Sequence, residues 1–504
     1  MDCVRSFILC IAILSSTAAF GDVEPKATPC TNTTTSHTLL VQGKKLDYEA
    51  VTGTFDIKDQ EQKPQGSLFY TAYFKQDAKK SAKTSERTRP IAFCFNGGPG
   101  SSSVWLHMGF SGPKKVCLND CAQTPIPGVY ENNPYTLLDK TDLVFIDPVS
   151  TGFSTALPGT NPRSFYGIQE DIDSFSEFIR LFLTKYHRWD SPRFLIGESY
   201  GTIRAVGLAE KLESSLFINL NGIILLSPCL DFQFYFQGDG NDLPYALYLP
   251  SYTAAAWYHK RLPEEQQKRA LKELLAEVEQ FALQEYVPAM LLGNRLDNTK
   301  REVLISKLSQ YTGLSPQYIQ SNFLRISAQE FFKELLKSES KVIGRFDSRY
   351  SGFYSPILDK SNPRDPSFDA VIDPFNSAFQ QYLFNELTID CLQPYTILNA
   401  EAVLPWNLSF NKLQAGLGYL RTSPIAGRLL ERNPSLGIFV ASGYYDLATP
   451  YFAAQQTFAS LDAAPSLLKN ITLNCYEAGH MMYLHEPSHA RMAGEIRKFI
   501  EERS

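Results

Sequence analysis

The pentapeptide GESYG at 197–201 contains residue types that can build a nucleophilic centre. It fits the pattern G-x-S-x-G, in which a serine stands on a sharp turn between a strand and a helix. An apolar run precedes it and a helical pattern follows it, as this turn requires. Glycines on both sides avoid the clash that a Cβ atom would make. The pattern predicts that Ser199 is a nucleophile; the alternative is a tight turn without chemistry.

A serine hydroxyl is a poor nucleophile unless a base removes its proton. After a serine of this kind, an acid and then a base follow along the chain. Asp446 comes directly after the apolar run 437–443, and His480 comes directly after the strand-like stretch 470–476. The order and spacing predict a triad of Ser199, Asp446 and His480.

Other residues near the end of the chain are weaker candidates for the same roles. His485 is the second candidate for the base, and Asp462 is the second candidate for the acid. His489 stands at the start of the last helical pattern, and we expect it at the surface. A single histidine or aspartate is usually structural, so the prediction depends on the ordered set of three residues.

A glycine-rich stretch, FNGGPGSSS at 95–103, directly follows another apolar run. Consecutive glycines allow backbone N–H groups to approach a ligand closely. We expect the N–H groups of Gly98 and Tyr200 to stabilise the oxyanion of a tetrahedral intermediate. The alternatives are a plain loop or a phosphate cradle, although the lysine of the phosphate-binding pattern is absent.

Short apolar runs alternate with amphipathic segments, which is typical of buried parallel strands alternating with helices. This alternation predicts an α/β fold with a mostly parallel central sheet. We expect strands at 46–57, 67–74, 91–95, 142–149, 193–196, 221–228, 437–443 and 470–476, and helices at 169–186, 202–212 and 489–502.

The middle of the chain, 231–393, is helical, charged and aromatic, and runs typical of buried strands are scarce there. We expect amphipathic helices at 262–284 and 327–337, the second beginning with a capping box of Ser327 and Glu330. We interpret this segment as a helical cap inserted into an α/β core. The predicted core consists of two parts, 39–230 and 394–504.

The start of the chain has the features of a secretory signal peptide over 1–21. Arg5 provides the positive charge, an apolar run follows at 7–14, and small residues then offer a cleavage site. The apolar run is too short to anchor the protein in a bilayer. Residues 22–38 are rich in Thr, Pro and Asn, and we expect a mobile segment there. The protein is therefore expected to be secreted or periplasmic, with an uncleaved amphiphilic start as the alternative.

Charge is nearly balanced, with 48 Lys and Arg against 53 Asp and Glu and a net charge of −5. No block of basic residues with interleaved aromatic residues is present. This composition argues against nucleic acid as a main partner. The oligomeric state is not indicated by the sequence.

The chain has nine cysteines, and two of them, Cys117 and Cys121, are close enough to form a disulfide across a short loop. The same spacing could be half of a metal site, but no second Cys or His pair accompanies it. Cys94 and Cys229 lie in apolar runs and are expected to be inert core residues. We therefore predict no metal site.

Five motifs occur in the order of a known family: FNGGPGSSS, DPVSTGFS, GESYG, SGYYD and AGHMMY. The sequence resembles the serine carboxypeptidase family and looks most like its bacterial branch. The resemblance implies an α/β-hydrolase fold with a helical cap and hydrolytic removal of C-terminal residues from peptides, optimally in acid and without a cofactor. It implies a triad of Ser199, Asp446 and His480, an oxyanion hole at Gly98 and Tyr200, and binding of the substrate's carboxylate by Asn96, Gly97 and Glu198.

The resemblance gives a reason for an acidic residue beside the serine. A protonated Glu198 can donate a hydrogen bond to a peptide carboxylate, whereas an ionised one repels it. Three positions depart from the family pattern: Cys94 replaces a Trp, Ser101 a Cys and Phe110 a second Glu. An aminopeptidase, an esterase or an acyltransferase therefore remains an alternative on the same fold. A further alternative is a binding protein without catalytic activity.

Overall fold

The computed structural model describes residues 32–59, 61–76, 89–121, 124, 126–238, 240–355, 364–403, 405–409 and 418–504. The predicted signal peptide at 1–21 lies outside these residues. The mobile segment predicted at 22–38 is wrong for its last part, because the first strand, β1, begins at Thr34. In the part of the chain described here, no helix is both long and apolar enough to cross a bilayer.

A ten-stranded sheet with the order β1-β2-β3-β7-β4-β9-β10-β13-β14 forms the centre of the molecule, and β8 pairs with β3. Strands β7, β4, β9, β10, β13 and β14 run parallel, while β1, β2 and β3 form an antiparallel extension. The predicted mostly parallel sheet is confirmed. The strands are β1 (Thr34–Val41), β2 (Lys44–Lys58), β3 (Pro64–Gln76), β4 (Ile91–Phe95), β7 (Asp142–Ile146), β8 (Thr155–Ala156), β9 (Arg193–Glu198), β10 (Gly222–Leu226), β13 (Gly437–Gly443) and β14 (Ile471–Tyr476).

The parallel strands are short and buried on both faces, as their continuous apolar runs predict. Alternate side chains enter two separate cores: Phe93 and Leu195 pack on one face, Phe194 and Ile196 on the other. Helices α2 (Ile168–Lys185), α3 (Tyr200–Leu216), α13 (Ser423–Arg432) and α14 (Tyr451–Ala459) cover the first face. Helix α16 (Glu486–Arg503) and a π-helical segment, η1 (Leu106–Ser111), cover the second.

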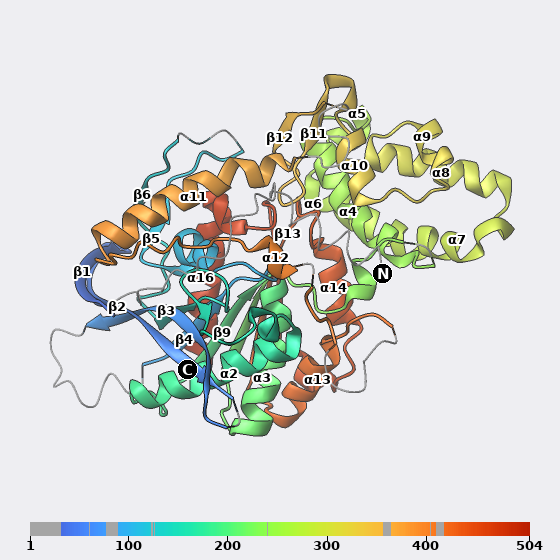
Figure 1. Cartoon of the computed structure of the whole chain (residues 1–504). Helices are drawn as coiled ribbons and strands as arrows, with labels where there is room; N and C mark the ends of the chain where they lie inside the picture. Colours follow the sequence, from blue (N-terminus) through green and yellow to red (C-terminus); the bar gives the residue numbers. More distant parts are fainter. Residues whose placement is uncertain are drawn as a thin grey trace.

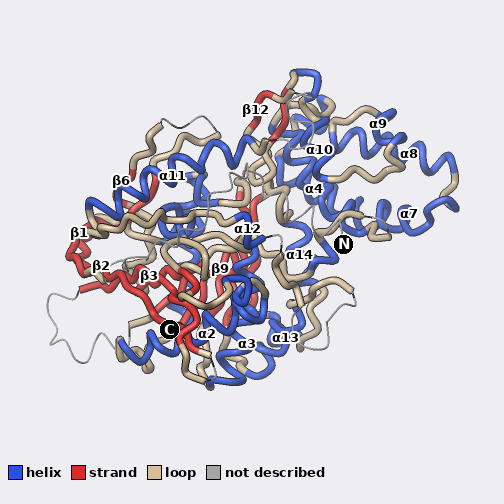
Figure 2. The backbone as a smooth tube through the Cα atoms, in the orientation of Figure 1, coloured by secondary structure: helices blue, strands red, loops and turns tan. Residues whose placement is uncertain are grey.

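Most of the segment between β10 and β13 belongs to two differently packed parts. One is a helical lobe that extends away from the sheet (Figures 1 and 2). The other is α11 (Pro366–Asn385), which packs on η1 and the small sheet of β5 (Lys114–Val116) and β6 (Tyr130–Asn132). The lobe contains α4 (Leu243–Tyr258), α5 (Glu264–Gln267), α6 (Leu271–Phe281), η4 (Ala282–Tyr286), α7 (Val287–Leu292), η5 (Gly293–Arg295), α8 (Asn298–Thr312), α9 (Pro316–Ser321), α10 (Ala328–Glu334), η6 (Lys337–Glu339), β11 (Lys341–Ile343) and β12 (Ser351–Phe353).

The helices of the lobe only partly follow the sequence prediction. The capping box of Ser327 and Glu330 is present at the start of α10. The single helix predicted at 262–284 is wrong, because extended backbone at Ala270 separates α5 from α6. The remaining short helices are η2 (Pro162–Phe165), η3 (Phe232–Phe234), α12 (Ala400–Val403), α15 (Pro465–Leu468) and η7 (Met482–Leu484).

The structure gives the state of cysteines whose pairing the sequence left open. Cys117 and Cys121 are both free thiols, so the disulfide that their spacing allows is not formed. Cys391 is disulfide-bonded. Cys94 and Cys229 are buried, and burial raises the pKa of each thiol to about 12, so neither forms a reactive thiolate near neutral pH.

Candidate active site

Ser199 stands alone between β9, which ends at Glu198, and α3, which begins at Tyr200. Its φ of 58° and ψ of −127° are strained for a residue with a side chain. The flanking glycines are required, because a Cβ atom at Gly197 would come within 2.3 Å of the Gly201 carbonyl oxygen. The predicted strand–turn–helix geometry is thus present, and it exposes the Ser199 side chain at the carboxyl edge of the sheet.

Asp446 and His480 follow two neighbouring parallel strands, β13 and β14, so the sheet brings their loops together. Nδ1 of His480 lies 2.7 Å from Oδ2 of Asp446. The second carboxylate oxygen of Asp446 accepts hydrogen bonds from the N–H groups of Ala448 (2.7 Å) and Thr449 (2.9 Å). The Thr449 hydroxyl donates to Oδ2 at 2.7 Å. The carboxylate is therefore held by four contacts in a fixed orientation toward the imidazole.

The charges in this pair stabilise each other. Burial opposes ionisation of Asp446, but the charge of His480 and hydrogen bonds from His480 and Thr449 hold the pKa of the carboxyl below its ordinary value. Burial also opposes protonation of His480, yet the Asp446 carboxylate raises the pKa of the imidazole above its usual value. An imidazole held in this way can accept a proton and remain oriented while it carries the charge.

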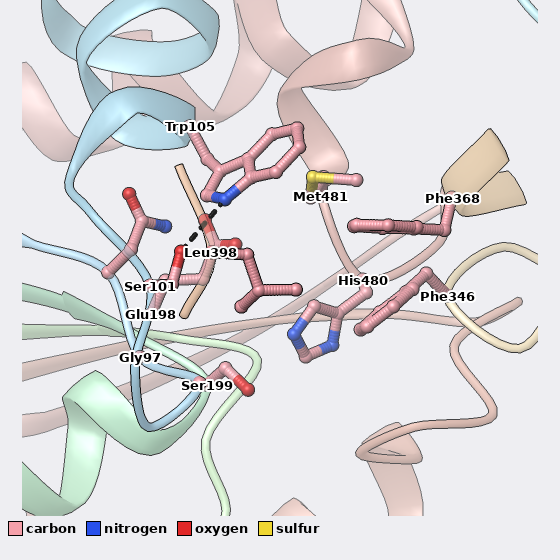
Figure 3. Close-up of a pocket in the computed structure, with 12 residues that line it drawn as sticks. Gly97, Ser101, Trp105, Glu198, Ser199, Phe346, Phe368, Leu398, His480 and Met481 are labelled. Carbon is pink, nitrogen blue, oxygen red and sulfur yellow. Dashed lines mark hydrogen bonds between the residues drawn. The ribbon is translucent and has the colours of Figure 1, made fainter. Parts of the chain in front are cut away.

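Ser199 and His480 line the same pocket and lie next to each other in it (Figure 3). Among the described residues, the Ser199 hydroxyl makes no hydrogen bond to the imidazole. Such bonds are often long or misaligned before a substrate is bound.

The glycine-rich loop after β4 lies directly against the turn at Ser199. A Cβ atom at Gly97 would come within 2.5 Å of the Tyr200 nitrogen, so only glycine permits this approach. Gly98 has a φ of 106°, which also favours glycine. Within the described chain, no hydrogen-bond acceptor takes the N–H of Gly98 or of Tyr200. Both donors are therefore available at the pocket that contains Ser199.

A buried ion pair that the sequence analysis missed supports this loop. Arg204, on α3, is fully buried; it donates to Oδ2 of Asp171 at 2.8 Å and to the Asn96 carbonyl at 2.5 Å. The Tyr200 hydroxyl also donates to Asp171, at 3.1 Å. The guanidinium thus ties the helix after the serine to the start of the glycine-rich loop. The only signal of this ion pair in the sequence was an arginine within the apolar stretch 203–209.

Glu198 and Asn96 lie at the base of the same pocket. Glu198 is 3% exposed, and its Oε2 has no hydrogen-bond partner in the described residues. Burial raises the pKa of this carboxyl to about 7, although His480 and Tyr483 lower it. Oδ1 of Asn96 accepts a hydrogen bond from the Leu106 N–H at 2.9 Å, which leaves its NH₂ group directed elsewhere.

The pocket walls are mostly apolar and aromatic, and the sequence analysis did not identify them. Figure 3 shows the rings of Phe346 and Phe368 at one side of Ser199 and the indole of Trp105 above it. They come from separate parts of the chain, which explains why no local pattern reveals them. The wall residues are Trp105, Phe346, Phe368, Leu398 and Met481, and the pocket encloses about 500 Å³ of space that is partly open to solvent.

The alternative acid and base candidates lie elsewhere. Asp462 is exposed in the loop after α14, and Nδ1 of His485 contacts the Ser488 hydroxyl at 2.8 Å. His489 was expected at the surface, but this is wrong: it is 1% exposed, and its Nε2 contacts the Phe110 carbonyl at 2.9 Å. It faces the core because it lies on the inner side of α16, where the Phe110 carbonyl satisfies the polar ring.

Comparisons with known proteins agree with this arrangement. The family model described as serine carboxypeptidase matches residues 42–499. Serine carboxypeptidase-like 45 from Arabidopsis thaliana is 25% identical over 197 residues, which cover 37% of this chain and 38% of that protein. Carboxypeptidase sxa2 from Schizosaccharomyces pombe is 27% identical over 173 residues, which cover 32% of each chain. The matched stretches thus span well under half of these relatives.

A solved structure is similar over most of its length. It is that of KEX1(delta)p, a prohormone-processing carboxypeptidase from Saccharomyces cerevisiae, with a TM-score of 0.55, 14% identity and coverage of 90% of this chain and 91% of that chain. At this identity the likeness supports the fold, and the predicted α/β-hydrolase fold is confirmed. The relatives named here are from a plant and yeasts, and nothing supports the expected likeness to the family's bacterial branch.

Proposed function

Because the chain belongs to the serine carboxypeptidase family, we propose that it is an exported serine-type carboxypeptidase that removes C-terminal residues from peptides. The observation that carries the proposal is the 2.7 Å contact between His480 and Asp446 at the pocket that also contains Ser199. Export is proposed from the features of residues 1–21.

The proposed reaction proceeds through an acyl-enzyme. The Ser199 oxygen attacks the carbonyl carbon of the last peptide bond, while Nε2 of His480 takes the hydroxyl proton. The imidazolium then gives this proton to the leaving nitrogen, the C–N bond breaks and the C-terminal residue departs. His480 next takes a proton from water, whose oxygen attacks the acyl carbon. The ester bond to Ser199 then breaks, the imidazolium returns the proton to the serine oxygen, and the shortened peptide leaves as a carboxylic acid. Asp446 holds the imidazole in the required tautomer and remains ionised.

The developing oxyanion would be stabilised by the N–H groups of Gly98 and Tyr200. Both are free of other acceptors in the described chain, and the α3 N-terminus adds a favourable field. Loss of one such donor typically costs about 3 kcal/mol of transition-state stabilisation. Arg204 supports this role indirectly, because it fixes the carbonyl of Asn96 next to the loop.

The proposed end-specificity depends on Glu198. A carboxyl with a pKa of about 7 is protonated in mild acid, where it can donate a hydrogen bond to the substrate's C-terminal carboxylate. The NH₂ group of Asn96 offers a second donor at the same base of the pocket. The apolar walls favour an apolar side chain on the residue that is removed.

Two measurements test the proposal. An N-blocked dipeptide with a free C-terminus should be cleaved, and its C-terminal amide should be cleaved much more slowly. A fluorophosphonate probe should label the folded protein, and Ser199→Ala should abolish labelling. Equal cleavage of acid and amide would favour the alternative of an esterase-like or acyltransferase-like enzyme on this fold. No labelling of the folded protein would favour a binding protein without catalytic activity.

A further inference from the structure

Tyr483 carries a buried hydroxyl that the proposed mechanism does not use. It lies in η7, three residues after His480, and its side chain is almost completely buried. The hydroxyl makes no hydrogen bond in the described part of the chain, although it lies beside the side chains of Glu198 and Asn96. Leaving a buried donor unpaired is costly, so its position beside another unpaired group requires an explanation.

The ring of Tyr483 is fixed, so its hydroxyl cannot turn to another partner. A Cβ atom at Gly109 would come within 2.4 Å of the ring, which shows that η1 lies directly against it. On another side the ring stacks on Phe110 at 6.0 Å between centroids, and it meets the ring of His489 edge-on at 6.4 Å. The packing therefore fixes the ring, while the hydroxyl lies beside Glu198.

The groups beside Tyr483 have matching hydrogen-bonding capacity. Oε2 of Glu198 is buried, has no partner in the described ranges of the chain and can accept a hydrogen bond. Oδ1 of Asn96 is already used by the Leu106 N–H, so the NH₂ group of Asn96 is the part that can donate to the Tyr483 oxygen. A protonated Glu198 keeps one oxygen as a donor and the other as an acceptor. A continuous chain of hydrogen bonds from Asn96 through Tyr483 to Glu198 can thus form.

We propose that Tyr483 is a positioning residue: its hydroxyl holds Oε2 of Glu198 and thereby orients the Glu198 proton toward the C-terminal carboxylate of the peptide. The inference rests on the proposed function, since it assumes that Glu198 meets that carboxylate. Burial keeps the pKa of the Tyr483 hydroxyl well above its ordinary value, so the phenol stays neutral and keeps its proton to donate. It adds no negative charge to the site.

Removal of the hydroxyl should change the pH dependence of binding in a defined direction. Apart from Tyr483, the titratable groups that face Glu198 are His480, which lowers the pKa of the carboxyl, and Asp446, which raises it. Tyr483 itself also lowers this pKa, because its O–H lies beside the carboxyl and stabilises the ionised form. In Tyr483→Phe the loss of peptide binding with rising pH should therefore occur at a higher pH than in the parent protein. A structural role alone would not move the pH at which half of the binding is lost.

The test measures binding without turnover. The full chain carrying Ser199→Ala is titrated by calorimetry with N-acetyl-Phe-Phe across pH 5–9, with and without Tyr483→Phe. We expect about 3- to 10-fold weaker binding at low pH, the usual effect of one lost hydrogen bond, and a midpoint displaced to higher pH. Binding of the C-terminal amide should change much less.

The control variant is Tyr48→Phe in β2, which pairs with the edge strand β1. It removes a similarly buried hydroxyl that has no hydrogen-bond partner among the described residues. It should alter neither affinity nor midpoint. Suppose that the parent binds the acid and not the amide, and that folded Tyr483→Phe shows the same affinity and the same pH midpoint of binding. This result would overturn the role of Tyr483 and leave the role of Glu198 intact. A parent that binds acid and amide equally at every pH would overturn carboxylate recognition by Glu198, and this inference with it.

Discussion

The main-chain N–H of His480 donates a hydrogen bond of 2.6 Å to the carbonyl oxygen of Phe346. Phe346 belongs to the loop between β11 and β12, far from His480 in the sequence, and its ring lies 5.1 Å from the imidazole. The same loop accepts a hydrogen bond from Leu447 through the Arg345 carbonyl at 3.0 Å. The segment inserted between β10 and β13 thus holds both the loop of the proposed acid and the loop of the proposed base.

Gly479→Ala should separate these two loops. A Cβ atom at this position would come within 2.4 Å of both the Phe346 carbonyl oxygen and the Cβ of Asp347, so the backbone before His480 must move. A displacement of about 1 Å in a catalytic group can reduce the rate about 10²-fold. We expect a fall of this order in kcat on a blocked dipeptide. Gly494→Ala is the control, because a Cβ atom there meets nothing within 4 Å; an equal kcat in both variants would contradict the prediction.

Asp446→Asn should preserve the fold and remove most of the activity. An asparagine at this position allows the imidazole of His480 to adopt the wrong tautomer, which reduces kcat by about 10³- to 10⁴-fold in comparable triads. KM should change little, because Asp446 does not face the substrate. Steady-state kinetics on the free-acid dipeptide measure both quantities. Asp462→Asn, an exposed residue, should behave like the parent protein; a comparable loss there would show that the acid has been misassigned.

The strands of the site could be predicted because their signals are local. The runs at 91–95 and 437–443 coincide with β4 and β13, since continuous burial on both faces demands continuous apolar sequence. The turn at Ser199 has a similarly local signature. The helix predicted at 262–284 failed for a tertiary reason. The indole N–H of Trp257 donates to the Arg269 carbonyl at 3.3 Å, and the Trp257 carbonyl accepts from the Gln267 side-chain amide at 2.8 Å. These contacts favour a break that periodicity does not reveal.

The supporting residues of the site could not be predicted because their partners are distant in sequence. Arg204 pairs with Asp171 across two helices, and Tyr483, in η7, lies beside Glu198, at the end of β9. No local sequence pattern links the two residues of either pair. The sequence offered Phe110 as a missing acid, and the structure instead provides a phenol beside Glu198.

Arg204→Met should destabilise the protein strongly. It would leave the Asp171 carboxylate buried without its charge partner, a change that typically costs 3–5 kcal/mol. Chemical denaturation at pH 7 measures the free energy of unfolding. Arg428→Met, which removes a partly exposed pair with Glu210, is the control and should cost about 0–1 kcal/mol. Similar losses in the two variants would mean that the buried pair does not stabilise the fold.

Glu198→Gln should remove the pH dependence of peptide binding. In the parent protein the carboxyl has a pKa of about 7, so it is protonated in mild acid and repels the peptide carboxylate above neutral pH. KM for a free-acid dipeptide should therefore rise as the pH increases through 7. The glutamine amide donates a hydrogen bond at every pH, so KM of the variant should stay level. A parallel rise of KM in both proteins would refute the role given to Glu198.

The same substitution should alter how stability depends on pH. Between the unfolded pKa of 4.5 and the folded pKa of about 7, the folded protein binds a proton at Glu198 that the unfolded chain releases, so stability falls as pH rises. Glu198→Gln removes this loss, on the order of 3 kcal/mol by pH 8. Denaturation at pH 5 and pH 8 should show the variant gaining relative to the parent at the higher pH. Glu502→Gln, at an exposed site, should show no such gain in the free energy of unfolding. If Glu198→Gln shows no gain either, the Glu198 carboxyl ionises in the folded protein without a cost in stability.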